Sequence, residues 1–310
     1  MAEKVSLREV GMRDGLQSLA PILSTDQKNA WCAAEFAAGV REIEVTSFVP
    51  AKLLPMFADA EDVVRHAQGL KGLKCSALIP NLRGAERGAA LGVEEVAYVL
   101  SVSEGHNQNN VRRSTQESIA DLKRVIELRN NLLPKQRMKV VAGLATSFGC
   151  TIEGNVDEKR VIEIAGQVLA LKPDGLTLAD TVGYGNPATI RRIFREVLDM
   201  SGPVPVTAHL HNTRGLGLAN LLAALEAGVR GFDASLGGLG GCPWAPGATG
   251  NIVLEDTVFM LEAMGIDTGI DLDQLIEVRR MVQSFMPGIT FHGELPKAGI
   301  PKNYSRRLAA

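Results

Sequence analysis

The chain has 310 residues and 45% of them are hydrophobic, so it can bury a large core. Its formal net charge of -2 gives no whole-protein reason to expect binding to nucleic acid or to an anionic membrane surface. The four cysteines are scattered without a Cys-x-x-Cys pair, and no stretch resembles a secretion signal or a membrane span. We therefore expect a cytoplasmic protein with reduced thiols.

Short apolar runs alternate with helix-like segments along the whole chain. This alternation predicts successive βα units around a parallel sheet. The expected strands are 5–10, 42–46, 73–79, 95–101, 139–146, 175–178, 204–209 and 231–236. Eight units favour a closed (β/α)8 TIM barrel over an open doubly wound sheet. We expect one catalytic domain over 1–286, including extra C-terminal helices at 252–264 and 272–285, and an irregular basic tail over 287–310.

Several helix signals lie between these strands. Ser114 followed by Glu117 matches a capping box, and Ser24 followed by Gln27 offers a second one. A leucine stripe at helical spacing predicts a helix packed against the barrel, and it consists of Leu218, Leu221, Leu222 and Leu225.

The first two strands end in charged residues, and a TIM barrel carries its chemistry where its strands end. Asp14 can offer an oxygen to a divalent cation, and Arg13 a planar fork for a carboxylate or an oxyanion, although a simple surface ion pair is the alternative. Glu44 lies inside an apolar strand, where an unpaired carboxylate is costly. We expect it to meet Arg13 or a metal-bound water.

The seventh strand ends in His209 and His211, whose i, i+2 spacing turns both imidazoles to one side. They either share a metal ion or form a polar strand end. Asp180, at the end of the sixth strand, is either a helix N-cap or the partner of a histidine ring N–H. Asn251 is likewise an N-cap or an oxygen donor. Asp14, the two histidines and Asn251 would make a mixed oxygen and nitrogen set that suits Mg²⁺ or Mn²⁺.

A glycine-rich loop over 237–251 carries Cys242. Six glycines favour a mobile segment, which suits a lid over the barrel mouth. The loop matches neither a dinucleotide-binding nor a Walker pattern. We interpret Cys242 as a candidate catalytic thiol.

These motifs together resemble the 3-hydroxy-3-methylglutaryl-CoA lyase family, among the metal-dependent TIM-barrel lyases and synthases. The resemblance covers nearly the whole chain and is carried by segments 9–17, 46–49, 180–183, 209–211 and 238–243. The first segment and the His-x-His pair are shared with isopropylmalate and homocitrate synthases. The cysteine-bearing loop is the specific one, and it resembles that of a CoA-thioester lyase.

The resemblance implies roles for individual residues. The metal ligands would be Asp14, His209, His211 and Asn251. Arg13 would stabilise an enolate oxygen, Cys242 would close over the site as an acid, and Glu44 would order the site. The group that takes the first proton stays open between Asp14, His209 and a metal-bound hydroxide.

Two departures from the family pattern concern the CoA substrate. Arg214 stands where the family usually has tyrosine, which adds a cation and changes the pocket. Ala20 stands where a lysine often contacts the CoA phosphates, and Arg112 and Arg113 either replace that contact or form a solvated loop. With Gln17, these three arginines are the predicted contacts of the acyl-CoA.

The resemblance implies cleavage of 3-hydroxy-3-methylglutaryl-CoA to acetyl-CoA and acetoacetate, as in leucine degradation, by a homo-oligomer (dimer or tetramer). One alternative is a citramalyl-CoA lyase that releases pyruvate. Others are a Claisen-type acyl synthase and a non-catalytic metabolite-binding protein.

Overall fold

A closed barrel of eight parallel strands forms the centre of the molecule, with the strands paired in chain order and β8 paired to β1. The computed structural model describes residues 4–134, 137–240, 250–302 and 304. The strands are β1 (Ser6–Glu9), β2 (Glu42–Ser47), β3 (Lys74–Ile79), β4 (Glu95–Ser101), β5 (Lys139–Ala145), β6 (Gly175–Asp180), β7 (Val206–Leu210) and β8 (Gly231–Ala234). The predicted TIM barrel is confirmed. Each predicted strand overlaps an observed one, with ends that differ by at most two residues.

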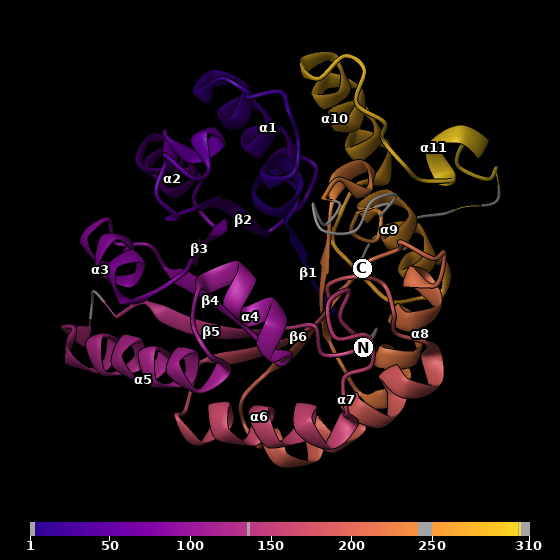
Figure 1. Cartoon of the computed structure of the whole chain (residues 1–310). Coiled ribbons are helices and arrows are strands. Elements are labelled where there is room, and N and C mark those ends of the chain that lie inside the picture. The colour runs from indigo at the N-terminus through magenta and orange to yellow at the C-terminus, as the bar shows by residue number, and fades with distance from the viewer. Residues whose placement is uncertain (1–3, 135–136, 241–249, 303, 305–310) are drawn as a thin grey trace.

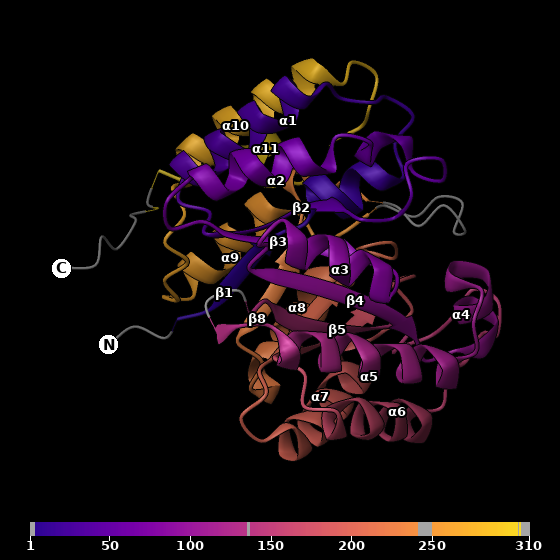
Figure 2. The ribbon, with the colours of Figure 1, turned by 90° about the vertical axis from the view of Figure 1, so that its left-hand side faces the viewer.

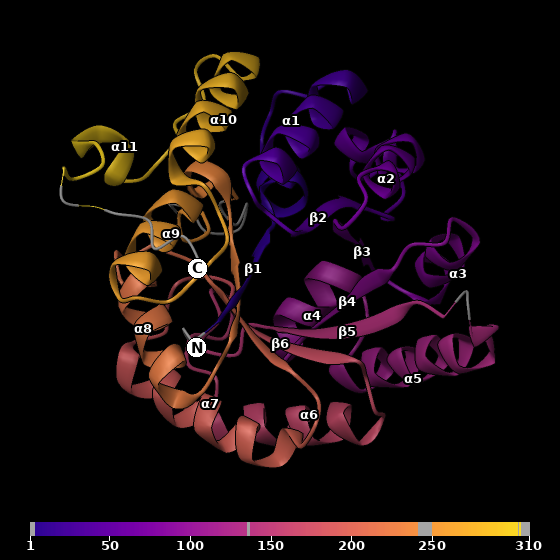
Figure 3. The same ribbon diagram turned by 180° about the vertical axis from the view of Figure 1, so that it is seen from behind.

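Helices surround the barrel, as Figure 1 and the opposite view in Figure 3 show. They are α1 (Thr25–Ala37), α2 (Ala60–Gly69), α3 (Leu82–Ala90), α4 (Glu104–Val111), α5 (Thr115–Asn131), α6 (Glu158–Ala170), α7 (Pro187–Ser201), α8 (Gly217–Ala227), α9 (Leu254–Ala263), α10 (Leu272–Phe285) and α11 (Leu295–Ala298). Short helical turns are η1 (Gly11–Gly15), η2 (Pro55–Phe57) and η4 (Leu236–Gly238). None of the described helices is both long and apolar enough to cross a membrane.

The local helix signals act as expected. Ser24 and Ser114 each accept a hydrogen bond from the backbone three residues on, and Gln27 and Glu117 close the two capping boxes. In the leucine stripe of α8, Leu221 and Leu225 are buried. The helices expected at 252–264 and 272–285 are α9 and α10.

The C-terminal helices extend the outer layer rather than forming a separate body. Helix α10 lies beside α1, so the first and the tenth helix of the chain form one pair (Figure 2). The segment after 286, expected to be irregular, contains the four-residue helix α11, with Pro296 in its first turn. Phe291 and Leu295 from this segment are buried in the core.

The barrel strands place alternate side chains inside and outside. On β6, for example, Thr177 and Ala179 line an internal cavity, whereas Leu176 and Leu178 are buried in the hydrophobic core. Helix α4 follows β4 and stands at the carboxyl end of the barrel (Figure 2). The strand ends and α4 therefore define the mouth where a site is expected.

Candidate metal centre

The first loop after β1 turns back tightly enough to bring two charged side chains over the barrel mouth. In η1 the backbone N–H groups of Asp14 and Gly15 both donate to the carbonyl of Val10, at 2.7 and 3.3 Å. A side chain at Gly15 would come within 3.0 Å of Leu239, so a glycine allows the loop to pack closely there.

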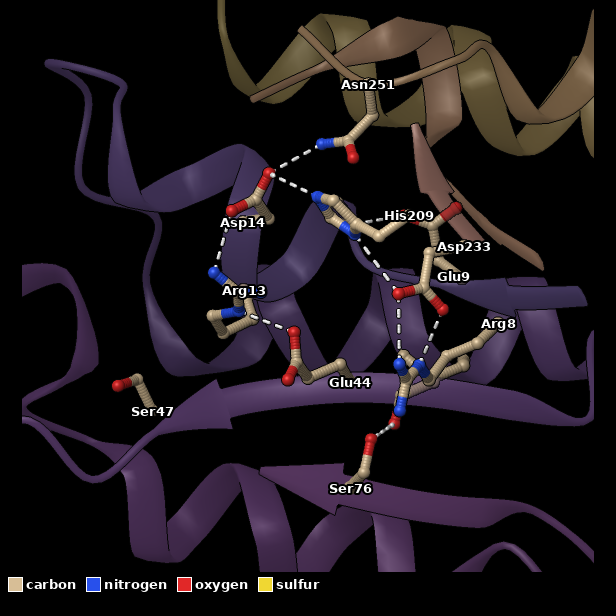
Figure 4. A network of polar contacts seen from close by, with 12 residues as sticks. Arg8, Glu9, Arg13, Asp14, Glu44, Ser47, Ser76, His209, Asp233 and Asn251 are labelled. Carbon is tan, nitrogen blue, oxygen red and sulfur yellow. Dashed lines mark hydrogen bonds and ion pairs between the residues drawn. The ribbon is translucent and has the colours of Figure 1, made fainter. Parts of the chain in front are cut away.

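Arg13 is held by two carboxylates. Its Nε donates to Glu44 Oε2 at 2.5 Å, and its Nη1 donates to Asp14 Oδ1 at 2.7 Å (Figure 4). Glu44 is 1% exposed, so this pairing compensates a fully buried carboxylate. The expectation that Glu44 meets Arg13 is confirmed.

Three potential metal-binding side chains converge above β7. The ligand atoms of Asp14, His209 and His211 lie within 4.8 Å of one another. Asp14 Oδ2 lies 4.0 Å from His209 Nε2 and 3.7 Å from His211 Nε2, and the two ring nitrogens are 3.1 Å apart. The first loop and the end of the seventh strand, which the sequence predicts to share one centre, therefore do lie together.

Asn251 completes this group, and its backbone is bridged to His211. Its Nδ2 donates to Asp14 Oδ2 at 2.7 Å and to the carbonyl of Leu239 at 3.0 Å. Its Oδ1 is buried and has no hydrogen-bond partner among the described residues, and the same is true of His211 Nδ1. An unpartnered amide oxygen beside a carboxylate and two imidazoles fits a divalent cation, because buried polar atoms otherwise need partners.

The protonation states suit ligation. Burial, together with the neighbouring His209, lowers the pKa of His211 to about 4. Burial opposes ionisation of Asp14, but Arg13 and the two histidines outweigh it and lower its pKa. At neutral pH a neutral imidazole and an ionised carboxylate therefore face the same point, which is the state that metal binding needs.

His209 has a partner that the sequence interpretation missed. Its Nδ1 lies 3.1 Å from Oδ2 of Asp233, which in turn binds Arg8. Burial favours neutral His209, but the hydrogen bond to Asp233 and the charge of Asp14 raise its pKa. An aspartate inside the apolar run of β8 was the available signal, of the same kind as Glu44 on β2.

Asp180, considered for that role, does not fill it. Its carboxylate accepts hydrogen bonds from the backbone N–H groups of Tyr184 and Gly185, at 2.8 and 3.1 Å. The physical reason is the alternation along β6, where Asp180 shares the outward face of Leu176 and Leu178. It orders the loop that follows its own strand.

A cavity of about 570 Å³ connects this centre to the rim of the barrel. Its lining includes the three candidate ligands, the inner strand residues Gly143 and Thr177, and predicted substrate contacts Gln17, Arg112 and Arg113. Arg113 is paired with Asp121 at 2.8 Å. Arg112 is exposed, and within the described part of the chain its guanidinium has no ion-pair partner. The cavity therefore runs from a candidate metal centre to the exposed guanidinium of Arg112.

Two predicted site residues are not part of this group. Arg214 donates to the carbonyls of Val182 and Gly183, at 2.8 and 3.2 Å, and lies over the ring of Tyr184. It does not line the cavity, because the loop after β6 holds the guanidinium. Cys242 lies outside the described residues.

The fold and the centre define a class: a TIM barrel with an Asp-His-His constellation and a partly buried, ion-paired arginine at its carboxyl end. The HMGL-like family model matches residues 4–282. The chain belongs to the HMGL-like family, as the motifs predict.

Individual relatives cover most of the chain. It is 39% identical to the hydroxymethylglutaryl-CoA lyase YngG of Bacillus subtilis over 284 residues, 92% of this chain and 94% of that protein. It is also 39% identical to the (R)-citramalyl-CoA lyase of Chloroflexus aurantiacus over 286 residues, 88% of each. A solved structure of an HMG-CoA lyase from Acinetobacter baumannii, in complex with coenzyme A and 3-methylmalate, superposes with a TM-score of 0.90 at 40% identity over 97% of both chains.

Proposed function

We propose that this protein is a metal-dependent acyl-CoA lyase that cleaves 3-hydroxy-3-methylglutaryl-CoA into acetyl-CoA and acetoacetate. The observation that carries the proposal is the convergence of Asp14, His209 and His211 beside Arg13, at the inner end of a cavity that reaches Arg112. The similarity to hydroxymethylglutaryl-CoA lyases over most of the chain supports it.

Asp14, His209 and His211, with Asn251, would hold Mg²⁺ or Mn²⁺. When bound, the cation supplies a Lewis acid that orients the substrate and lowers the cost of removing its hydroxyl proton.

Arg13 faces the charge that develops during cleavage. The carbon-carbon bond breaks toward the thioester, so its electron pair enters the thioester carbonyl and forms an enolate. Glu44 and Asp14 hold Nε and Nη1 of Arg13, and Nη2 has no partner among the described residues. A donor fixed in advance near an oxygen that becomes negative lowers the barrier more than it strengthens substrate binding.

Two proton transfers complete the reaction. The 3-hydroxyl loses a proton as acetoacetate forms, and the enolate carbon gains one to become the methyl group of acetyl-CoA. Asp14 and His209 are the described candidates for the first transfer, since both line the cavity next to Arg13. We assign the second transfer to Cys242, as the family resemblance implies.

The outer part of the cavity would take the coenzyme A. Gln17, Arg112 and Arg113 line it, and Arg112 is the residue whose charge is available for a phosphate. We leave Arg214 out of this set, since binding there would cost it both carbonyl contacts and the Tyr184 ring.

A citramalyl-CoA lyase is the second candidate, because the chain is as similar to one such enzyme as to a hydroxymethylglutaryl-CoA lyase. The bond cleaved is of the same kind, and the keto product is pyruvate instead of acetoacetate.

One assay tests both candidates. Purified protein with Mg²⁺ or Mn²⁺ is given each thioester, and NADH oxidation is followed with a coupling dehydrogenase for acetoacetate or for pyruvate. We expect turnover of 3-hydroxy-3-methylglutaryl-CoA at the higher kcat/KM. Preferential turnover of citramalyl-CoA would select the second candidate, and cleavage of neither would remove the lyase proposal.

We further propose that the protein works in the cytoplasm as a homo-oligomer, either a dimer or a tetramer, and serves leucine degradation. Cys32, Cys75 and Cys150 are free and buried, which suits a reducing compartment. Sedimentation equilibrium would give the oligomeric state, and a monomer would contradict that part of the proposal.

A further inference from the structure

We propose that Arg8 is a positioning residue that acts on the metal centre through Asp233 and His209. The inference rests on the proposed metal centre but not on the identity of the thioester. Arg8 binds Asp233 through a two-point ion pair, with Nε to Oδ1 and Nη2 to Oδ2 both at 2.9 Å. Asp233 Oδ2 then lies 3.1 Å from His209 Nδ1 (Figure 4).

The three side chains come from three adjacent strands. In the strand register Arg8 pairs with Asp233 between β1 and β8, and Asp233 pairs with His209 between β8 and β7. All three side chains face the barrel interior and line the cavity. The series of contacts from Arg8 through Asp233 to His209 therefore follows one level of the barrel wall and includes no loop residue.

A fourth group orients Arg8 from the opposite wall. Glu95, on β4, accepts a hydrogen bond from Nη1 of Arg8 at 3.1 Å. The guanidinium plane is thus fixed between Glu95 and Asp233, which is a geometry that a planar fork allows and a single ammonium does not.

The arrangement determines which nitrogen of His209 is free to bind a cation. Asp233 is 2% exposed, and among the described residues its ion-pair partners are Arg8 and His209. An ionised Asp233 accepts the Nδ1 proton, so the Nε2 lone pair points toward Asp14 and His211. Without Arg8, Asp233 would lose the two hydrogen bonds that fix its carboxylate, and the imidazole would lose its fixed orientation.

Metal affinity tests this role without any thioester. Metal-stripped protein is titrated with Mn²⁺, and free Mn²⁺ is measured by electron paramagnetic resonance for wild type, Arg8→Met and Arg8→Lys. Arg129→Met is the matched control, because Arg129 is buried and, like Arg8, ion-paired to an aspartate, in this case Asp174, but does not line the cavity.

We expect Arg8→Met to raise the Kd for Mn²⁺ by about 10- to 100-fold, the usual effect of removing a group that orients a ligand. Arg8→Lys should raise it by several-fold, since lysine restores the charge but not the fork. Arg129→Met should lower the Tm and leave the Kd unchanged.

The outcomes separate this inference from the proposed function. A folded Arg8→Met protein with the wild-type Kd would overturn the inference; if that variant does not fold, an unchanged Kd in Arg8→Lys would do so. A wild type that binds no Mn²⁺ would also overturn it. A wild type that binds Mn²⁺, loses affinity on substitution at Arg8, yet cleaves neither thioester would leave the inference standing and remove the lyase assignment.

Discussion

The two halves of the barrel interior differ sharply in chemistry. The half built from β1, β2, β7 and β8 points charged or ionisable side chains inward, and each is in contact with another such side chain. These residues are Arg8, Glu44, His209, His211 and Asp233. The half built from β3, β4, β5 and β6 lines the same cavity with neutral residues, and several of these are small: Ala97, Gly143, Ala145, Thr177 and Ala179. Glu95 of β4 is charged, but it binds Arg8 and does not line the cavity.

This difference explains how one barrel can hold a rigid centre and still admit a long substrate. A TIM-barrel interior is ordinarily filled by layers of bulky side chains. Here the charged half is filled and connected, which fixes the positions of the ligand atoms, whereas the small side chains leave room opposite. The hydroxyl of Thr177 is buried and has no hydrogen-bond partner among the described residues. We therefore propose that the charged half serves chemistry and that the neutral half serves binding.

The largest effect should come from removing the cation proposed to bind Asp14, His209 and His211. Chelation and dialysis should reduce lyase activity to below about 1% of the starting rate, and added Mg²⁺ or Mn²⁺ should restore it. The Tm should rise on metal addition, because the folded centre binds the ion and the unfolded chain does not. Full activity in protein that mass spectrometry shows to be metal-free would contradict the assignment of metal-dependent chemistry to the charged half.

Within the charged half, Arg13→Met should reduce kcat by about 10²- to 10³-fold, the usual result of losing one donor to a developing oxyanion. KM should change much less, because the interaction strengthens mainly in the transition state. Steady-state kinetics on the preferred thioester measure both. Arg13→Lys serves as the companion variant. An equal kcat in wild type and both variants would mean that Arg13 only forms the ion pairs with Glu44 and Asp14 and does not stabilise the transition state.

On the neutral half, Gly143→Leu should fill the cavity and raise KM by about tenfold, with a smaller effect on kcat. Gly143→Ala is the matched control, because a Cβ there would meet only the carbonyl oxygen of Tyr98, at 3.6 Å. We expect the alanine variant to keep near wild-type kinetics. If leucine at this position lowered kcat and left KM unchanged, the neutral half would not be a binding surface.

The smallest effect on activity is expected from a carboxyl outside the barrel. No cation pairs with Glu35 among the described residues, in contrast to Asp14, Glu44 and Asp233. Burial raises the pKa of Glu35 to about 8, from an ordinary value of 4.5. Its folded form is therefore protonated at neutral pH. The contribution of the protonated Glu35 carboxyl to the free energy of unfolding is complete below about pH 4.5 and is lost as the pH rises through 8.

The Glu35→Gln variant has no carboxyl to ionise at this position. The difference in free energy of unfolding, variant minus wild type, should therefore increase from pH 5 to pH 9 by on the order of a few kcal/mol. Urea denaturation at several pH values measures the difference, and kcat should stay unchanged. Glu196→Gln, at an exposed position of α7, should show no such trend. A pH-independent difference for Glu35→Gln would mean that the folded protein keeps this carboxylate charged.

The strand and helix assignments were predictable because they depend on local patterns. The apolar runs and the two capping boxes correspond to elements in the structure. The family was predictable too, since its motifs lie in continuous segments such as 9–17 and 209–211. The pairing of Glu44 with Arg13 followed from one physical rule, that a charge in an apolar strand needs a partner.

Where the sequence left a contact undecided or did not suggest it, the deciding contacts join residues distant in sequence. Asp180 and Asp233 both lie in apolar strands, but only strand alternation and pairing show that Asp233 faces His209 and Asp180 does not. Arg214 is adjacent to the metal motif in sequence, yet the turn after β7 carries its guanidinium to the carbonyls of another loop.

The sequence by itself determined the kinds of group available: which strands exist, which carry a carboxylate, an imidazole or a guanidinium, and which family pattern they match. Only the tertiary structure decided which of these groups touch, because barrel closure brings β1 against β8 and so places Arg8 on Asp233 across 225 residues of chain. Hydrogen bonds and ion pairs act over a few ångströms, and a linear sequence does not contain those distances.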